Sequence, residues 1–240
     1  MNMIGIIPAR YASSRFPGKP LSVIKGKPMI QWVYELACKT QSLKRVVVAT
    51  DDDRISGCVK GFGGDVVMTS SAHLSGTDRC AEAAELLKSQ GVDFQAVINI
   101  QGDEPFLDPG IIDKLAAEFA DQTVEIATIA GFFDNDKDVL DPNKVKVVTD
   151  IDHNALYFSR SPIPFLRSVG GEKPKYLRHA GIYGYRADVL QKITRLMPGK
   201  LELAESLEQL RWLENGYRIR VIVADYQTVA IDTPDDLTQI

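Results

Sequence analysis

The first half of the chain alternates short, almost wholly apolar runs with segments of helical character. Parallel strands that are buried on both faces have this composition, because the helices that connect them cover the sheet. We predict strands at residues 3–7, 45–49, 65–69 and 95–100, and helices at 28–40, 53–62, 77–90 and 108–119. The pattern therefore predicts an α/β fold with a mostly parallel sheet and helices on both faces.

The second half has a different character. Residues 144–149 and 155–159 alternate apolar and polar side chains on either side of a turn-like Asp-His-Asn sequence, which predicts an antiparallel pair. We predict further strands at 179–185, 218–224 and 228–231, a surface loop at 160–176, and helices at 202–215 and from 233 onward. The change near residue 140 indicates an antiparallel subdomain within a single domain that spans residues 1–240.

Composition excludes several classes of protein. The net charge of −4 gives no electrostatic support for nucleic-acid binding. No apolar run approaches the roughly 18 residues that a membrane span needs, and no signal peptide is visible. Cys38, Cys58 and Cys80 form no CxxC pair and lie in helical segments, so we expect buried free thiols in a reducing cytoplasm. The three widely spaced histidines argue against a histidine-based metal site.

The loop after the first predicted strand is the strongest pointer to a ligand. The strand ends at Pro8, and the next residues carry Arg10, Arg15 and Lys19 among small and bend-prone residues. In open α/β sheets, ligands bind outside the carboxyl ends of the strands, where this loop would lie. Three cations there favour a ligand with several negative charges, such as a triphosphate, over the common alternative of a solvated basic loop.

This loop does not match the phosphate-binding loop GxxxxGK[ST]. Gly18-Lys19 is followed by Pro20, which has no amide proton to donate to a phosphate. Side chains must therefore hold the phosphates, the arginines as planar forks and the lysine as a compact charge. The glycine-rich run at 61–64 follows a predicted helix, whereas the dinucleotide-binding fingerprint follows a strand.

Two carboxylates follow predicted strands. Asp103 lies in the sequence QGDEP after the strand at 95–100, beside a glycine that permits close approach, and Asp232 follows the predicted strand at 228–231. Each alone could be an ordinary turn or capping residue. Together they match Mg²⁺, which prefers one or two protein carboxylates with substrate phosphate and water. With a cationic loop, they supply the groups that nucleotidyl transfer requires, a reaction in which positioning and charge neutralisation dominate.

Eight segments along the whole chain carry a family resemblance. They are IIPARYASSRFPGKPL, VATDDDRI, SGTDR, NIQGDEPF, ALYFSR, RHAGIYGYR, SLEQLRWLENG and IDTPDDL, in this order. The chain resembles the 3-deoxy-manno-octulosonate cytidylyltransferases (CMP-Kdo synthetases). This resemblance implies a Rossmann-like nucleotidyltransferase fold, transfer of CMP from CTP to 3-deoxy-manno-octulosonate (Kdo) for lipopolysaccharide biosynthesis, Mg²⁺ as cofactor, and a homodimer. Residues from about 1 to 140 would bind the nucleotide, and those from about 141 to 240 would bind the sugar and dimerise.

The resemblance also assigns residues to the two substrates. On the nucleotide side it implies Arg10, Arg15 and Lys19 for the CTP phosphates, Asp103 and Asp232 for Mg²⁺, and Pro8, Ala9, Ser75, Gly76 and Thr77 for the cytosine, with Arg10, Arg15, Lys19 and Asp103 as the catalytic set. On the sugar side it implies Arg79, Gln101, Arg160, His179, Tyr183, Glu208 and Gln209. An acid sugar needs cationic partners for its carboxylate and polar partners for its hydroxyls.

Other interpretations remain for several of these residues and for the activity. Ser75 could simply cap a helix, Tyr183 and His179 could be core residues, and Glu208 could lie on a solvated helix face. The sugar could be a sialic acid or the 8-amino analogue of Kdo. A sensor that binds the nucleotide sugar without chemistry is the alternative outside the enzymes, and the presence of both carboxylates argues against it.

Overall fold

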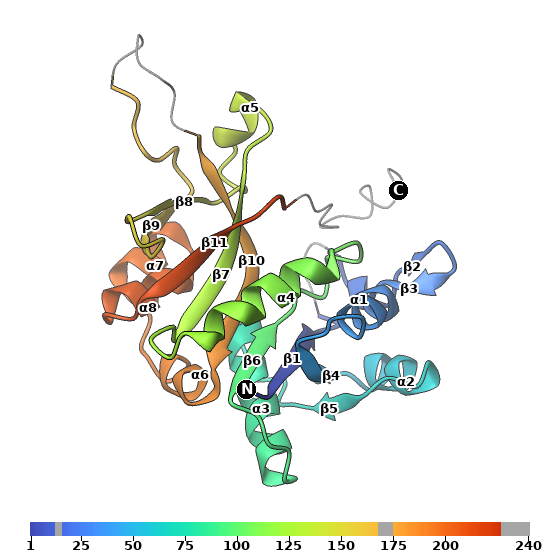
Figure 1. The fold of residues 1–240 in the computed structure, drawn as a ribbon. Helices are drawn as coiled ribbons and strands as arrows, with labels where there is room; N and C mark the ends of the chain where they lie inside the picture. The colour runs from blue at the N-terminus through green and yellow to red at the C-terminus, as the bar shows by residue number, and fades with distance from the viewer. Residues whose placement is uncertain (13–15, 168–174, 227–240) are drawn as a thin grey trace.

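A twisted sheet runs through the centre of the molecule (Figure 1). The computed structural model describes residues 1–12, 16–167 and 175–226. The nine strands of the sheet within these residues are β1 (Met3–Ala9), β4 (Leu43–Thr50), β5 (Val66–Met68), β6 (Ala96–Asn99), β7 (Ile126–Phe132), β8 (Lys146–Thr149), β9 (Ala155–Ser159), β10 (Leu177–Arg186) and β11 (Ile219–Val223). A separate hairpin is formed by β2 (Val23–Ile24) and β3 (Lys27–Pro28). The mostly parallel α/β architecture predicted from the sequence is confirmed.

The strand order is β11-β7-β10-β6-β1-β4-β5. The pairs β1–β4, β1–β6, β4–β5 and β7–β11 are parallel. The strand β10 comes from the second half of the chain, yet it lies between β6 and β7 and is antiparallel to both. The first residues of β10 also pair with β8, which in turn pairs with β9, so the predicted antiparallel part continues the main sheet. Both halves of the chain therefore build one sheet.

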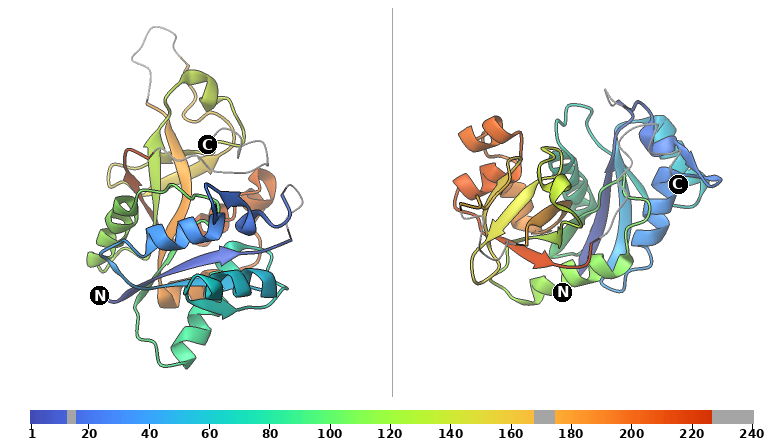
Figure 2. Two further views of the ribbon diagram at one scale, coloured as in Figure 1. Left: turned by 90° about the vertical axis from the view of Figure 1, so that its right-hand side faces the viewer. Right: turned by 90° about the horizontal axis from the view of Figure 1, so that it is seen from above.

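Helices cover both faces of this sheet (Figure 2). Within the described residues they are α1 (Met29–Ala37), α2 (Asp53–Gly61), α3 (Gly76–Ser89), α4 (Pro109–Ala117), α5 (Asp136–Val139), α6 (Ala187–Ile193), α7 (Lys200–Glu205) and α8 (Gln209–Glu214), with 3₁₀ turns η1 (Lys19–Leu21) and η2 (Glu118–Ala120). Successive residues of a strand point to opposite faces. Ile6 accordingly belongs to the apolar cluster that contains side chains of α3, α6 and α8, whereas Ile7 belongs to the cluster on the other face, with side chains of α1, α2 and α4.

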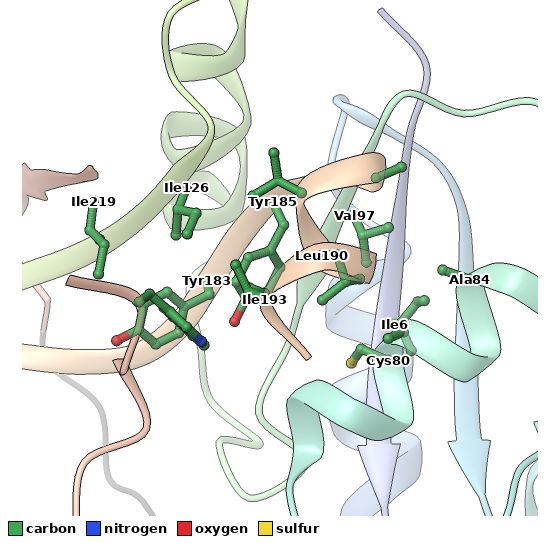
Figure 3. Packing of buried hydrophobic residues seen from close by; sticks show 14 of the residues in the cluster. Ile6, Cys80, Ala84, Val97, Ile126, Tyr183, Tyr185, Leu190, Ile193 and Ile219 are labelled. Carbon is green, nitrogen blue, oxygen red and sulfur yellow. The ribbon is translucent and has the colours of Figure 1, made fainter. Parts of the chain in front are cut away.

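The core on the α3 side contains aromatic rings as well as aliphatic side chains (Figure 3). Tyr183 and Tyr185 on β10 are stacked, with ring centroids 5.8 Å apart, and both meet the ring of the fully buried Trp212 edge-on. Such edge-to-face pairs add to the stabilisation that burial of the rings provides. The cluster anchors α8 against β10, and the residues next to Trp212 in α8 are thereby fixed relative to the sheet.

The structure corrects three expectations. The helix predicted at 202–215 is divided into α7 and α8, because Ser206 has a left-handed backbone with φ of 52°. As a result Leu203 is 69% exposed, whereas Leu207 and Leu210 are buried. The cysteines are free, but Cys38 is exposed at the end of α1 and only Cys80 is fully buried. The strand β7 has no counterpart among the predicted elements.

No helix in the described parts of the chain combines the length and the apolar composition that are needed to cross a bilayer. The strand predicted at 228–231 and the helix predicted from 233 lie outside the described residues.

Candidate active site

A cavity of about 260 Å³ opens beyond the carboxyl ends of β1 and β6, next to the start of α3. Nine of the predicted site residues line it: Pro8, Ala9, Arg10, Lys19, Ser75, Gly76, Arg79, Gln101 and Asp103. These residues come from three separate segments of the chain. Because β1 and β6 are parallel neighbours, the loops that follow them meet at one edge of the sheet.

The loop after β1 is folded back so that a cation reaches the neighbouring strand end. Gly18 has φ of 73°, and its N–H donates to the carbonyl oxygen of Tyr11 over 2.9 Å. A left-handed residue is tolerated best as glycine. This turn starts η1 at Lys19, whose ammonium lies 2.8 Å from an oxygen of Asp103. Arg10 lines the same cavity, and Arg15 lies outside the described residues.

The loop after β6 needs a glycine to approach β1. A Cβ atom on Gly102 would lie 3.2 Å from the carbonyl oxygen of Pro8, which is backbone and cannot move aside easily. This close approach brings Asp103 into the cavity, where its side chain is 30% exposed. Asp103 therefore lies in the same cavity as the predicted cations Arg10 and Lys19.

The chemistry of these donors fits a magnesium ion that is shared with a bound phosphate. Mg²⁺ takes oxygen ligands and often has only one or two carboxylates, with phosphate and water completing its shell. Asp103 supplies one carboxylate beside cations that suit a phosphate. Within residues 1–12, 16–167 and 175–226, no group of three or more His, Cys, Asp or Glu side chains forms a metal site of the protein alone. Asp232 lies outside this part of the chain.

The start of α3 forms another wall of the cavity. Ser75 is its N-cap and accepts a hydrogen bond from the N–H of Asp78. Gly76 faces β1, because a Cβ atom there would lie 3.3 Å from Cγ of Pro8. Thr77 is buried and points elsewhere, since its hydroxyl donates to Glu208 over 2.6 Å. Ser75 thus combines the capping role with a place in the cavity wall.

Two of the residues predicted for the sugar lie in the cavity wall. Arg79 is 4% exposed; its guanidinium donates to the hydroxyl of Thr69 over 2.7 Å and lies 3.1 Å from Asp51. Gln101 donates from its amide to the carbonyl oxygen of Gly181 over 2.6 Å. This bond ties the loop after β6 to the central strand β10.

Arg160 lies outside the cavity lining and connects loops of the second half. Its guanidinium donates to three carbonyl oxygens, those of Pro142, Glu205 and Ser206, over 2.9, 2.7 and 3.2 Å. The Arg160 N–H also donates to the Glu205 carboxylate. In this structure Arg160 therefore holds the corner between α7 and α8, directly before Glu208.

His179 and Tyr183 lie in the aromatic cluster rather than in the cavity lining. The His179 ring packs edge-on against Phe158 and 5.3 Å from the Tyr183 ring, and its Nε2 lies 3.1 Å from the Thr128 hydroxyl. Desolvation in this packing lowers the pKa of His179 to about 3 and raises the pKa of Tyr183 well above its ordinary value. His179 is therefore neutral at physiological pH.

Glu208 and Gln209 begin α8 behind the α3 wall. Gln209 is buried. Burial raises the pKa of Glu208, although the hydrogen bond from Thr77 opposes this effect. The Thr77–Glu208 contact joins the nucleotide-side wall to the residues predicted for the sugar side.

Sequence reasoning missed two notable side chains here. His73 lines the cavity next to Ser75 and is hydrogen-bonded to Glu82. Glu104 follows Asp103 and is buried, and its carboxylate accepts a hydrogen bond from the Tyr226 hydroxyl. Desolvation raises the pKa of Glu104 to about 7. The position of His73 two residues before the SGT segment was a usable signal; nothing in the sequence showed that Glu104 would be buried.

The chain is similar to known cytidylyltransferases over its whole length. A family model described as cytidylyltransferase matches residues 4–219. The 3-deoxy-manno-octulosonate cytidylyltransferase of Bacteroides thetaiotaomicron is 53% identical over 244 residues, and that of Parabacteroides distasonis is 51% identical over 247 residues. Each alignment covers 99% of this chain and 96% of the relative. The structure of a CMP:2-keto-3-deoxy-manno-octonic acid synthetase complexed with CTP has a TM-score of 0.91 and 44% identity, with coverage of 100% and 96%.

The low pKa of His179 predicts a pH-dependent stability. Below about pH 6.5, the ordinary histidine pKa, the unfolded chain binds a proton at this residue and the folded chain does not, so stability falls as the pH falls. The loss ends near pH 3, where the folded state is protonated as well. A part of the residue remains accessible to solvent, which reduces the expected effect. Between roughly pH 7.5 and 5.5, we expect the free energy of unfolding of wild type to fall by about 1 kcal/mol more than that of a His179→Gln variant.

Urea unfolding of both proteins at the two pH values measures this difference. His153→Asn is the matched control, because it removes an exposed histidine at φ of 60°, a conformation that asparagine tolerates. Equal pH dependence of wild type and His179→Gln would show that the ring is solvated in the folded state.

Proposed function

The chain belongs to the 3-deoxy-manno-octulosonate cytidylyltransferase family, and we propose that it transfers the CMP group of CTP to Kdo and releases pyrophosphate. The observation that carries the proposal is the meeting of Lys19 and Asp103 in one cavity at the carboxyl ends of β1 and β6. The similar synthetase structure, which was determined with CTP, supports the choice of nucleotide. CMP-Kdo made in this way would supply lipopolysaccharide biosynthesis.

The reaction is a displacement at phosphorus. The anomeric hydroxyl of the sugar attacks the α-phosphorus of CTP, a new C–O–P linkage forms, and the bond to the β-phosphate oxygen breaks. Arg10 and Lys19 neutralise the triphosphate and the leaving pyrophosphate, while the cavity walls hold the reactants in line. The hydroxyl proton passes to solvent water as the linkage forms. No step requires a covalent enzyme intermediate.

Magnesium is part of this proposal. Asp103, which lines the cavity, would hold the ion, and Asp232 is the second proposed ligand. When bound, the ion supplies charge neutralisation at the phosphates and a lower pKa for the attacking hydroxyl. Lys19 already neighbours Asp103, so the carboxylate is held at the place where phosphate, cation and metal would meet.

The sugar would lie beside the nucleotide, toward β10. Arg79 and Gln101 line the cavity and are the proposed first contacts for the sugar carboxylate and hydroxyls. His179, Tyr183 and Arg160 have protein partners in this structure. Their proposed contacts with the sugar therefore require local rearrangement, as do those of Glu208, which accepts a hydrogen bond from Thr77, and of Gln209, which is buried.

A homodimer in the cytoplasm completes the proposal. The end of β7 and the start of β10 lie next to α5 (Figure 1), and exposed apolar side chains belong to this part of the chain. Phe132 is 51% exposed and Phe165 is 85% exposed, and the Tyr176 hydroxyl holds Pro164, the neighbour of Phe165, near this end of β10. Apolar surface of this kind is stabilised when a second copy covers it.

Replacement of Asp103 by Asn is expected to lower turnover by at least about a hundredfold, the scale of losing one preorganised electrostatic group. Pyrophosphate release at saturating CTP, Kdo and Mg²⁺ measures the change. Asp152→Asn makes the same chemical change in an exposed turn and serves as control. A folded Asp103→Asn enzyme with near-normal turnover would exclude the proposed metal role.

A panel of acid sugars tests the choice of substrate. We expect pyrophosphate release with Kdo to exceed release with a sialic acid or with 8-amino-Kdo. Faster turnover of one of those sugars would replace Kdo in the proposal. Binding of CTP without pyrophosphate release from any sugar, with any divalent metal, would instead indicate a sensor.

The dimer is tested by the molar mass of the full chain in solution, measured by light scattering after size exclusion. We expect twice the monomer mass for wild type and a shift toward monomer for Phe132→Asp. Leu203→Asp is the control, because it charges an apolar side chain of similar exposure on α7. A wild-type chain that is monomeric at micromolar concentration would refute the dimer.

A further inference from the structure

His73 occupies the wall of the cavity that leads to the start of α3. It precedes Ser75 by two residues, and its ring Nε2 is hydrogen-bonded to a carboxylate oxygen of Glu82, which lies in the second turn of α3. The same Glu82 oxygen accepts the N–H of Ser70 over 2.8 Å. Glu82 therefore fixes both the loop that carries His73 and the plane of its ring.

The partner of Nε2 decides what the other ring nitrogen can do. Partial burial opposes ionisation of Glu82, but the hydrogen bonds from Ser70 and His73 outweigh it and lower the pKa of this carboxyl group. An ionised carboxylate only accepts hydrogen bonds, so Nε2 carries the proton of a neutral ring. Nδ1 is then an acceptor, and among the described residues it has no hydrogen-bond partner.

The cavity wall around His73 is the one expected to meet the nucleobase. Ser75 and Gly76 follow it after one intervening residue, Leu74, and a Cβ atom on Gly76 would lie 3.3 Å from Cγ of Pro8 in the same cavity wall. The phosphate-binding cation Lys19 instead meets Asp103 at the ends of β1 and β6. This placement of the base rests on the proposed function, in which CTP is the nucleotide.

Cytosine and uracil differ most at the atom group on ring carbon 4. Cytosine carries an amino group there, which donates hydrogen bonds, whereas uracil carries an oxygen, which only accepts them. An acceptor nitrogen on the cavity wall can accept a hydrogen bond from the cytosine amino group. Opposite the uracil oxygen, the same nitrogen would leave two acceptors facing each other. A site that is built to accept a hydrogen bond rejects a ligand that cannot donate one.

We propose that His73 selects cytosine over uracil by accepting a hydrogen bond from the 4-amino group through Nδ1, and that Glu82 is the positioning residue that keeps this nitrogen an acceptor. His73 is a specificity-determining contact, and Glu82 acts through it. Replacement of Glu82 by Gln removes the fixed acceptor at Nε2, because an amide can also donate. The His73 ring then has access to the other tautomer, in which Nδ1 donates and suits uracil.

The test is equilibrium binding of CTP and UTP to the full chain at about pH 8, measured by displacement of a fluorescent cytidine nucleotide without any sugar. For His73→Ala we expect CTP affinity to fall about tenfold and UTP affinity to change little, as for the loss of one hydrogen bond. For Glu82→Gln we expect the ratio of CTP to UTP affinity to fall at least about fivefold. Glu85→Gln, an exposed position on α3, is the matched control.

The outcomes separate this inference from the proposed function. If wild type prefers CTP and both variants keep that preference, the base is read by other groups and the inference is wrong, while the cytidylyltransferase proposal stands. If both variants lose CTP and UTP affinity equally, the pair only supports the loop, and the inference is also wrong. If wild type binds neither CTP nor UTP, the proposed function fails first.

Discussion

The site depends on one close contact between two loops, in which the ammonium of Lys19 lies 2.8 Å from Asp103. An isolated carboxylate at this place would repel a triphosphate. With the lysine in place, the carboxylate can face phosphate oxygens without a net repulsion. Two glycines make the contact possible, Gly18 through its left-handed turn and Gly102 through its approach to the backbone of β1.

The central sheet places residues from the second half of the chain beside this contact, so the site has two sides. The strand β10 returns from the second half of the chain and enters the sheet beside β6. Gln101 bonds to the backbone of β10, and Thr77 on α3 bonds to Glu208 at the start of α8. The walls expected to hold the nucleotide and the sugar are therefore joined by direct hydrogen bonds.

The sequence predicted the strands that the first half contributes to the main sheet, because each is a short apolar run that ends at a polar or breaker residue, but it missed the short hairpin strands β2 and β3. Arg10, Lys19 and Asp103 all follow such runs, and the structure brings these three predicted site residues into one cavity. The sequence pattern failed at the helix over 202–215, where apolar spacing continued through Ser206 although the backbone turns left-handed there. Local pattern carries no information about a turn that long-range contacts, such as those from Arg160 to Glu205 and Ser206, hold in place.

By itself, the sequence determined the α/β class, the order of most strands along the chain and the residue types that can hold a triphosphate. These are local properties, set by apolar runs, breakers and charge. Only the tertiary structure decided that β10 lies between β6 and β7, that His179 and Tyr183 pack into an aromatic cluster, and that Glu82 orients His73 at the cavity wall. Each of these depends on residues that are distant in sequence or on opposite sides of a turn, and their contact energies exist only once the chain has folded.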